Sequence, residues 1–193
     1  YWLDLRGRIL AEWKENLPYM VAAFYLLLAI GHLGIFDVLY YHTYQCGLHR
    51  RVECQREVLW HTMRHLVYGS QFVAIANLRF HGAALLALAG LYAADVGIAW
   101  ADVWEETESR RALGGLPRGE YFMHIVLSVL VGCYLATVAH AVLPDLGLPA
   151  AVVLEPPAVP ASLRAYMTLM GISALGLFAF DLRRWYSFRA AFP

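Results

Sequence analysis

Two glutamate–histidine pairs in the sequence share the same spacing of four residues. Glu57 is followed by His61, and Glu120 is followed by His124. Residues four apart lie one turn apart on the same face of an α-helix, so each pair can aim a carboxylate and an imidazole at one point. Carboxylate oxygen and imidazole nitrogen are ligands that iron, manganese and zinc accept in proteins. The spacing therefore predicts metal binding by both pairs.

A stripe of acidic residues lies in the segment between these two pairs. Asp95, Asp102 and Glu106 follow one another at intervals of seven and four residues, which places all three on one face of a helix. Glu105 neighbours Glu106, and a helix end that unwinds can exchange the two. We prefer Glu106 as the ligand because it shares the stripe with Asp102.

Such a cluster of carboxylates needs cations to compensate its negative charge. An ionised side chain within a membrane span costs about 2.5–3.5 kcal/mol, and several carboxylates held together repel one another unless positive charge compensates them. Two divalent ions, iron first and zinc or manganese as alternatives, match four carboxylates, as in di-metal helical bundles that use Glu-x-x-His. The spacing here is one residue longer. The predicted ligands are Glu57, His61, Asp102, Glu106, Glu120 and His124, with His65, Glu105, His42 and Asp37 as alternates.

Three other interpretations of the same residues stay open at this point. A metal-free network in which arginines neutralise the acids needs only Arg64, Arg110 and Arg111. A zinc site built from His61, His65 and Asp102 would suit a hydrolase acting on lipid. A b-type haem between His81 and His140 is a third alternative, but we expect interfacial or hydrogen-bonded histidines at both positions.

The composition indicates how these residues are held in place. Hydrophobic residues make up 60% of the 193 residues and charged residues 16%, against about 25% charged in soluble domains. A helical span needs about 20 largely apolar residues, and five segments meet that length, at 17–41, 57–79, 80–104, 120–143 and 162–182. Residues 1–16 alternate apolar and charged side chains, which predicts an amphipathic helix in the membrane interface. We expect an all-α integral membrane protein, with residues 17–193 forming one five-helix transmembrane domain.

Basic residues indicate how the bundle is oriented. Nine of the 15 Lys and Arg residues lie in the first and third connections and in the C-terminal tail, and three lie in residues 1–16, whereas the loop 144–160 has no Lys or Arg. The positive-inside tendency then places those connections and the C-terminus in the cytoplasm and the N-terminus outside, as in a bacterial inner membrane or its equivalent. The candidate ligands all lie near that cytoplasmic side. The net charge is zero, which gives no reason to expect nucleic acid as a partner.

The function predicted from these observations is that of a membrane oxidoreductase. A di-metal centre, with iron as the first choice, would oxidise a hydrophobic substrate that enters from the lipid bilayer. One alternative is a non-catalytic accessory subunit of a larger membrane complex, and another is a zinc-dependent lipid hydrolase. The sequence assigns no catalytic residue. Three scattered cysteines, Cys46, Cys54 and Cys133, predict free thiols.

Overall fold

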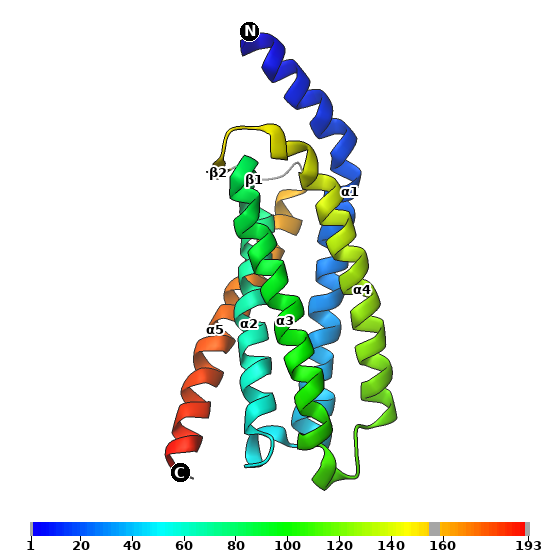
Figure 1. Cartoon of the computed structure of the whole chain (residues 1–193), viewed down its shortest axis with the longest axis vertical. Helices are drawn as coiled ribbons and strands as arrows, with labels where there is room; N and C mark the ends of the chain where they lie inside the picture. Colours follow the sequence, from blue (N-terminus) through cyan, green and yellow to red (C-terminus); the bar gives the residue numbers. More distant parts are fainter. Residues whose placement is uncertain (1, 155–158, 192–193) are drawn as a thin grey trace.

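The protein is an elongated bundle of five long helices (Figure 1). The computed structural model describes residues 2–154 and 159–191, with side chains from 17 to 154 and from 159 to 190. The helices are α1 (Trp2–Asp37), α2 (Gln55–Asn77), α3 (Leu85–Ser109), α4 (Arg118–Val142) and α5 (Ala161–Ala191). A π-helix at Val38–Gln45 continues α1, and short 3₁₀ turns occupy Leu48–Arg50, Gly82–Ala84, Arg111–Leu113 and Leu143–Gly147. The all-α class predicted from the sequence is confirmed.

Four helical segments are long and apolar enough to cross a membrane. They are Leu17–Gln45, Gly82–Ser109, Arg118–Gly147 and Ala161–Ala190. Within the described residues α2 does not join them, because its polar side chains lower its hydropathy, although it is 23 residues long. Glu57 in the first turn of α2 is fully buried, whereas Arg56 beside it is exposed. A membrane protein with four such helices is supported, and the fifth span stays a prediction.

The N-terminal segment differs from the separate interfacial helix expected for residues 1–16. Helix α1 runs without interruption from Trp2 to Asp37 and contains Pro18. Its first part leans away from the other helices (Figure 1). A proline inside a helix removes one backbone hydrogen bond and favours a bend. The amphipathic interfacial placement stays a prediction, and Tyr1 lies outside the described residues.

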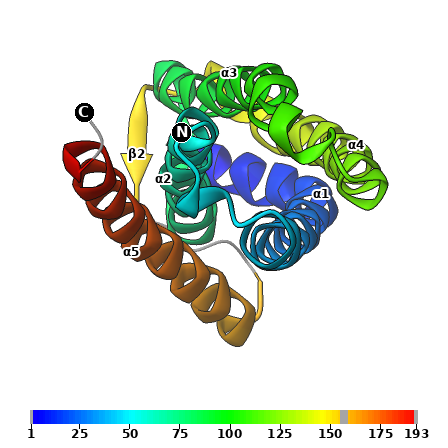
Figure 2. The same ribbon diagram turned by 90° about the horizontal axis from the view of Figure 1, so that it is seen from below.

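Helix packing leaves α5 on the outside of the bundle, as Figure 2 shows. Helix α1 packs along α4, while α2 packs between α3 and α5. Small residues allow the closest of these approaches: a Cβ added to Gly69 would lie only 3.0 Å from the backbone oxygen of Gly171. The apolar core joins all five helices through side chains that include Phe24, Phe72, Leu88 and Met167.

One end of the bundle is closed by two short strands that the sequence did not predict. Strand β1 (Arg79–His81) pairs antiparallel with β2 (Ala151–Val153). Arg79, the first residue of β1, donates two hydrogen bonds of 2.9 Å to the carboxylate of Asp145. We call this end the strand end.

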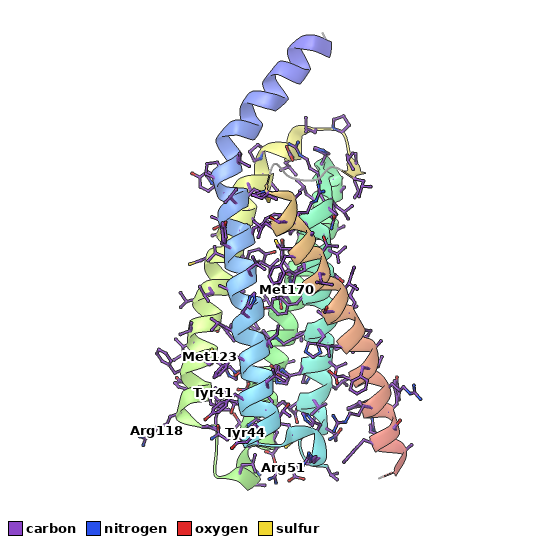
Figure 3. All side chains as sticks on the ribbon, turned by 180° about the vertical axis from the view of Figure 1, so that it is seen from behind. Tyr41, Tyr44, Arg51, Arg118, Met123 and Met170 are labelled. Atoms are coloured by element: carbon purple, nitrogen blue, oxygen red, sulfur yellow. The ribbon has the colours of Figure 1, made fainter. Side chains whose placement is uncertain are left out.

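The opposite end carries the two polar connections and the described end of α5, and we call it the polar end. Figure 3 shows Tyr44, Arg51 and Arg118 at this end, where the π-helix and the beginnings of α2 and α4 meet. Asp37 and the acidic end of α3 lie here too. All the residues proposed as ligands belong to elements that begin or end at the polar end.

Candidate metal centre

Nine ionisable side chains from four segments come together inside the polar end. Most are buried, and Glu57 and Glu120 have no exposed surface. Both glutamates occupy the first turn of their helix, α2 and α4 respectively. The carboxylate–histidine cluster, as we call it, consists of Asp37, His42, Glu57, His61, Asp102, Glu106, Arg110, Glu120 and His124. All six ligands predicted first from the sequence are therefore in one network.

The π-helix brings one further histidine into the cluster. Five residues separate Asp37 from His42, which in an α-helix would point about 140° apart around the axis. The π-helix instead forms bonds to the fifth residue, such as that from the backbone N–H of Cys46 to the carbonyl of Tyr41, 2.9 Å long. The wider turn places the two side chains on one side, with His42 Nε2 3.4 Å from Asp37 Oδ2.

His42 lies at the middle of the cluster. Its Nε2 atom is 2.9 Å from Glu120 Oε1, and its ring centroid is 4.1 Å from that of His61 and 6.4 Å from that of His124. The three imidazoles come from the π-helix, α2 and α4. From the sequence, His42 was predicted only as an alternate ligand, at the cytoplasmic end of the first span.

Two groups of three ligand atoms are close enough to bind an ion. One group is His42, Glu57 and His61, and the other is Asp37, His42 and His124; within each group the ligand atoms lie within 4.8 Å of one another. One imidazole nitrogen binds one ion, so His42 Nε2 serves one of the two groups at a time.

Neighbouring side chains can complete whichever group lacks His42. Asp102 Oδ1 lies 3.4 Å from His61 Nε2, beside the first group. Glu120 Oε1 lies 2.9 Å from His42 Nε2, between the two groups. Each group of three therefore reaches four ligands when an adjacent carboxylate also binds its ion. The two ions would then have different sets of ligands.

Many of these ligand atoms are buried without a hydrogen-bond partner. In the cluster they are Asp37 Oδ1, His42 Nε2, Glu57 Oε1, His61 Nε2, Asp102 Oδ1, Glu106 Oε1 and Glu120 Oε2. Leaving a buried polar group unpaired costs about 1–3 kcal/mol, and more when the group is charged. Among these atoms, His61 Nε2 lies 3.4 Å from Asp102 Oδ1 and 3.6 Å from Glu57 Oε1, close to the spacing of about 3.0–3.4 Å between ligands that share an ion at about 2.1 Å. The unpaired atoms thus have the spacing of metal ligands.

Arg110 supplies part of the positive charge. It is fully buried and donates hydrogen bonds of 2.5 Å to both Glu57 Oε2 and Glu120 Oε1. Ser109 also donates to Glu57. Although burial opposes its charge, the neighbouring carboxylates, Glu57 first, raise the pKa of Arg110 above its ordinary value. Arg110 is therefore a permanent cation that occupies one oxygen of each glutamate and leaves the other oxygen free.

The arginines do not neutralise the whole cluster. Arg64 binds Asp102 at 3.2 Å, but Arg111 is exposed and pairs with Glu108 instead. Five carboxylates thus face two guanidinium groups, which leaves an excess of three negative charges while the histidines are neutral. Two of the three arginines named for a metal-free network are in place, and their charge covers less than half of the acids.

The other alternates and Asp95 have partners outside the cluster. His65 Nδ1 lies 3.2 Å from Asp181 on α5, and Glu105 lies 3.4 Å from the exposed Arg56. Asp95 accepts a hydrogen bond of 3.0 Å from Gln71, deeper in the bundle. Of the four alternates, Asp37 and His42 join the predicted ligands, while His65 and Glu105 do not.

The histidines considered for haem also have separate partners. His81 Nδ1 lies 3.7 Å from Asp145, and the ring of His140 packs against Tyr19 with centroids 4.1 Å apart. His61 and His65, considered together for zinc, face Asp102 and Asp181 respectively.

The three cysteines are free, as the sequence indicated. Cys46 and Cys54 are buried beside Leu48 in a small apolar cluster, whereas Cys133 is exposed on α4. Burial, followed by the nearby Glu57 carboxylate, raises the pKa of Cys54 to about 11. Cys54 is therefore a protonated thiol at neutral pH and not a thiolate ligand.

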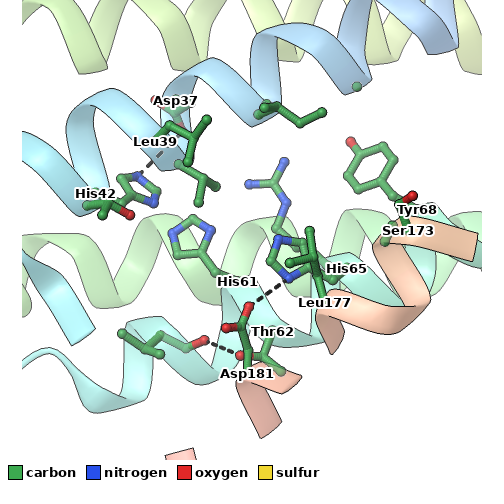
Figure 4. Close-up of a pocket in the computed structure, with 18 of the residues that line it drawn as sticks. Asp37, Leu39, His42, His61, Thr62, His65, Tyr68, Ser173, Leu177 and Asp181 are labelled. Carbon is green, nitrogen blue, oxygen red and sulfur yellow. Dashed lines mark hydrogen bonds and ion pairs between the residues drawn. The ribbon is translucent and has the colours of Figure 1, made fainter. Parts of the chain in front are cut away.

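A pocket of about 630 Å³ adjoins the cluster and is bounded by α1, the π-helix, α2 and α5. Figure 4 shows Asp37, His42 and His61 along one part of its wall, with Leu177 and Asp181 of α5 across from α2. Its remaining lining is largely apolar. The pocket gives the cluster a neighbouring space large enough for a small molecule.

Comparisons of this chain with protein-family models, with curated proteins and with solved structures found no match.

Proposed function

We propose that the carboxylate–histidine cluster is a di-metal centre, with iron as the first choice, in a membrane oxidoreductase that acts on a hydrophobic substrate. The observation that carries the proposal is the convergence of buried, unpaired ligand atoms from the π-helix, α2, α3 and α4. Buried polar groups in native proteins are normally paired, so a concentration of unpaired ones at metal-ligand spacing calls for an ion.

Electrostatics supports two cations over none. With its histidines neutral and Arg64 counted beside Arg110, the cluster holds three uncompensated negative charges, and two divalent ions would bring four positive charges to them. Charges buried without compensation cost several kcal/mol each, whereas carboxylates that bind a metal are neutralised by direct contact.

The geometry suggests different roles for the ligands. His124 turns its Nε2 atom toward Asp37 at 3.4 Å and its Nδ1 atom toward Glu106 at 3.3 Å. A histidine that binds metal commonly gives its other N–H to a carboxylate, which fixes the ring and its tautomer. We propose that Asp37 and His124 bind an ion directly and that Glu106 orients His124. On α2, His61 and Glu57 form the corresponding pair of direct ligands for the other ion.

The pocket supports a hydrophobic substrate. It joins an apolar space between helices to the wall formed by Asp37, His42 and His61, so a bound molecule would lie against the centre. When bound, iron supplies the activation of O₂. In the reaction that we propose, one oxygen atom enters a C–H bond of the substrate and the other leaves as water. An external reduced electron carrier supplies two electrons, with two protons from solvent.

The orientation remains part of the proposal. The polar end carries most of the arginines in the connections and in the last turns of α5, and the strand end carries few. We propose that the polar end faces the cytoplasm, where soluble electron carriers and metal ions are available.

Oxygen consumption by the iron-loaded protein tests this function. Purified protein is loaded with ferrous iron without air, excess iron is removed, and O₂ uptake is followed after addition of a reductant. We expect uptake in proportion to bound iron, and its loss in His124→Ala. His140→Ala at the strand end is the matched control and should behave as wild type. Iron-loaded protein that consumes no O₂ would contradict an oxidase function.

Arg110 favours one rival interpretation, a purely structural network in an accessory subunit. Its guanidinium binds both Glu57 and Glu120, so it holds the two carboxylates together without a metal. In that case the protein would bind no metal after loading and would be isolated only as part of a stoichiometric larger complex. One tightly bound zinc with no redox metal would favour the hydrolase instead.

A further inference from the structure

The pocket beside the cluster is elongated along α5. Its lining on that helix runs from Tyr166 to Phe188, and a helix rises by 1.5 Å per residue, so Tyr166 and Arg184 within it are about 27 Å apart. At the Tyr166 level, His32 Nε2 and the Tyr166 hydroxyl are hydrogen-bonded at 2.8 Å, which links α1 to α5. The pocket therefore has one end near the middle of the bundle and the other at the polar end.

The two ends of the pocket differ in chemistry. Toward the middle of the bundle the wall is formed by apolar side chains, among them Ile30, Phe72, Leu127, Leu169 and Met170. At the polar end it includes His49, Arg184 and Trp185, together with the cluster side chains Asp37, His42 and His61. An elongated space with this distribution is complementary to a molecule with an apolar tail and a polar head.

The charge at the polar end favours an anionic head. Asp181 is the acidic residue of α5 in this wall, and it is already paired with His65 at 3.2 Å. Among the described side chains no carboxylate forms an ion pair with the exposed Arg184, so its guanidinium is available to a ligand. Burial, then the charge of Arg184, lowers the pKa of His49, so that neutral His49 can donate one further hydrogen bond.

We infer that this pocket binds a single-chain amphiphile with an anionic head, such as a long-chain fatty acid, with the head at Arg184 and the tail toward Tyr166. The volume of about 630 Å³ falls in the range of about 300–1,000 Å³ for sites that hold one small molecule, so we choose a free single chain rather than a two-chain phospholipid. The inference names the substrate class for the proposed oxidation and in that respect rests on it, although binding itself requires no metal.

The cluster faces the head-proximal part of such a ligand. The Nε1 atom of Trp185 donates to the backbone oxygen of Gln55, and Asp181 pairs with His65, so the last turns of α5 lie beside the first turns of α2. His61 lies between Gln55 and His65 along α2. The carbons next to the head would therefore lie nearest to His61 and His42, and the far end of the tail would lie away from them.

Binding of palmitate to the metal-stripped protein in nanodiscs of neutral phospholipid tests the inference. Gly34 lines the pocket, and a Cβ there would meet no atom within 4 Å, so Gly34→Phe can introduce a ring beside the ligand without a clash at its Cβ. Gly90 on α3 is exposed, has equally open surroundings and does not line the pocket, so Gly90→Phe is the matched control. We expect saturable binding of about one palmitate, a loss on the order of tenfold or more in Gly34→Phe, and none in Gly90→Phe.

The anionic head is tested separately with hexadecanol, which has the same chain and no charge. Wild type should prefer palmitate, and Arg184→Gln should weaken palmitate binding on the order of tenfold while leaving hexadecanol unchanged. Arg183→Gln, an exposed neighbour outside the pocket lining, should change neither. Equal binding of the two compounds by wild type would overturn the anionic head.

Two other results would overturn the inference itself. One is palmitate binding that Gly34→Phe leaves intact in a correctly folded protein, as judged by its circular dichroism and its sizing profile. The other is stoichiometric retention of phospholipid that Gly34→Phe abolishes. Because these experiments use metal-free protein, their failure leaves metal binding untouched, and a failure of metal binding leaves them interpretable.

Discussion

Both ends of the bundle bury acidic residues, but the buried carboxylates have different partners at the two ends. At the strand end, Asp145 receives two hydrogen bonds from Arg79 and has His81 beside it, so one carboxylate meets at least one full positive charge. At the polar end, five carboxylates meet two arginines, and seven ligand atoms have no hydrogen-bond partner. The strand end has the balance expected of a structural clamp, whereas the polar end has an excess of negative charge.

A buried ion pair and a candidate cation site differ in how much of the counter-charge the protein itself supplies. Ionisable residues in a membrane bundle are expensive at either end, so their presence alone does not discriminate. What discriminates is whether the protein supplies its own counter-charges. The strand end does so with Arg79, while the polar end supplies Arg110 and Arg64 and leaves room for further cations.

Removal of Arg110 should give the largest change in stability. Arg110→Met leaves Glu57 and Glu120 buried without their guanidinium partner, which should cost about 3–5 kcal/mol of unfolding free energy. Arg111→Met is the matched control, because its exposed pair with Glu108 is worth less than about 1 kcal/mol. Unfolding by SDS from mixed micelles measures both. Equal effects of the two substitutions would refute a central role for Arg110.

Neutralising one carboxylate at each end tests whether that carboxylate belongs to an ion pair or to a metal site. Asp145→Asn should lower the unfolding free energy by about 1–3 kcal/mol, because the bidentate pair with Arg79 is lost, and should leave bound metal unchanged. Asp37→Asn should instead release metal from the group formed with His42 and His124. Metal analysis beside the unfolding curves separates the two outcomes. Loss of metal in Asp145→Asn would show that the ends are not independent.

Glu106 should affect how tightly metal is bound more than how much is bound. Glu106→Gln removes the carboxylate that faces His124 Nδ1 and should weaken metal affinity by about 10–100-fold. The number of ions bound at saturation should not change. Competition with a chromogenic chelator measures the affinity. A lower stoichiometry at saturation would show that Glu106 is itself a ligand, as the sequence analysis first supposed.

Thiol reactivity gives the smallest expected effect. Because Cys54 is buried and its pKa is raised to about 11, it stays protonated at pH 8 and should resist N-ethylmaleimide. Exposed Cys133 should be modified in the same reaction. In Arg110→Met, loosening of the polar end should expose Cys54, which mass spectrometry of the labelled peptides detects. Rapid labelling of Cys54 in the wild type would contradict the closed packing of this end.

Much of the site could be predicted from sequence spacing because helical periodicity is regular. The four-residue spacing of Glu57 with His61 and of Glu120 with His124 required only that α2 and α4 be helical, and the stripe on α3 followed in the same way. Antiparallel helices with short connections then bring these ends to one side of the bundle. Apolar length also predicted α2, α3 and α4 within about five residues at their ends, but not the early start of α1 at Trp2 or the extension of α5 to Ala191.

The parts that could not be predicted depend on irregular backbone and on long-range contacts. His42 reaches the cluster through a π-helix, a rare structure for which α-helical spacing gives the wrong direction. Arg110 was named with Arg64 and Arg111 as a possible counter-charge, but spacing did not indicate that Arg110 alone turns inward between Glu57 and Glu120. The strand pair joins segments about 70 residues apart through only three residues each, too few to leave a period in the sequence.

The most direct test of the central claim is the metal content of the purified protein. Wild type and His42→Ala are each loaded with ferrous iron, freed of loose metal and measured by elemental analysis, with His140→Ala as the control. We predict about two equivalents of iron in wild type and in the control, and a clear loss in His42→Ala, because His42 belongs to both groups of ligands. Wild-type protein that retains no iron, manganese or zinc after loading would contradict the metal centre.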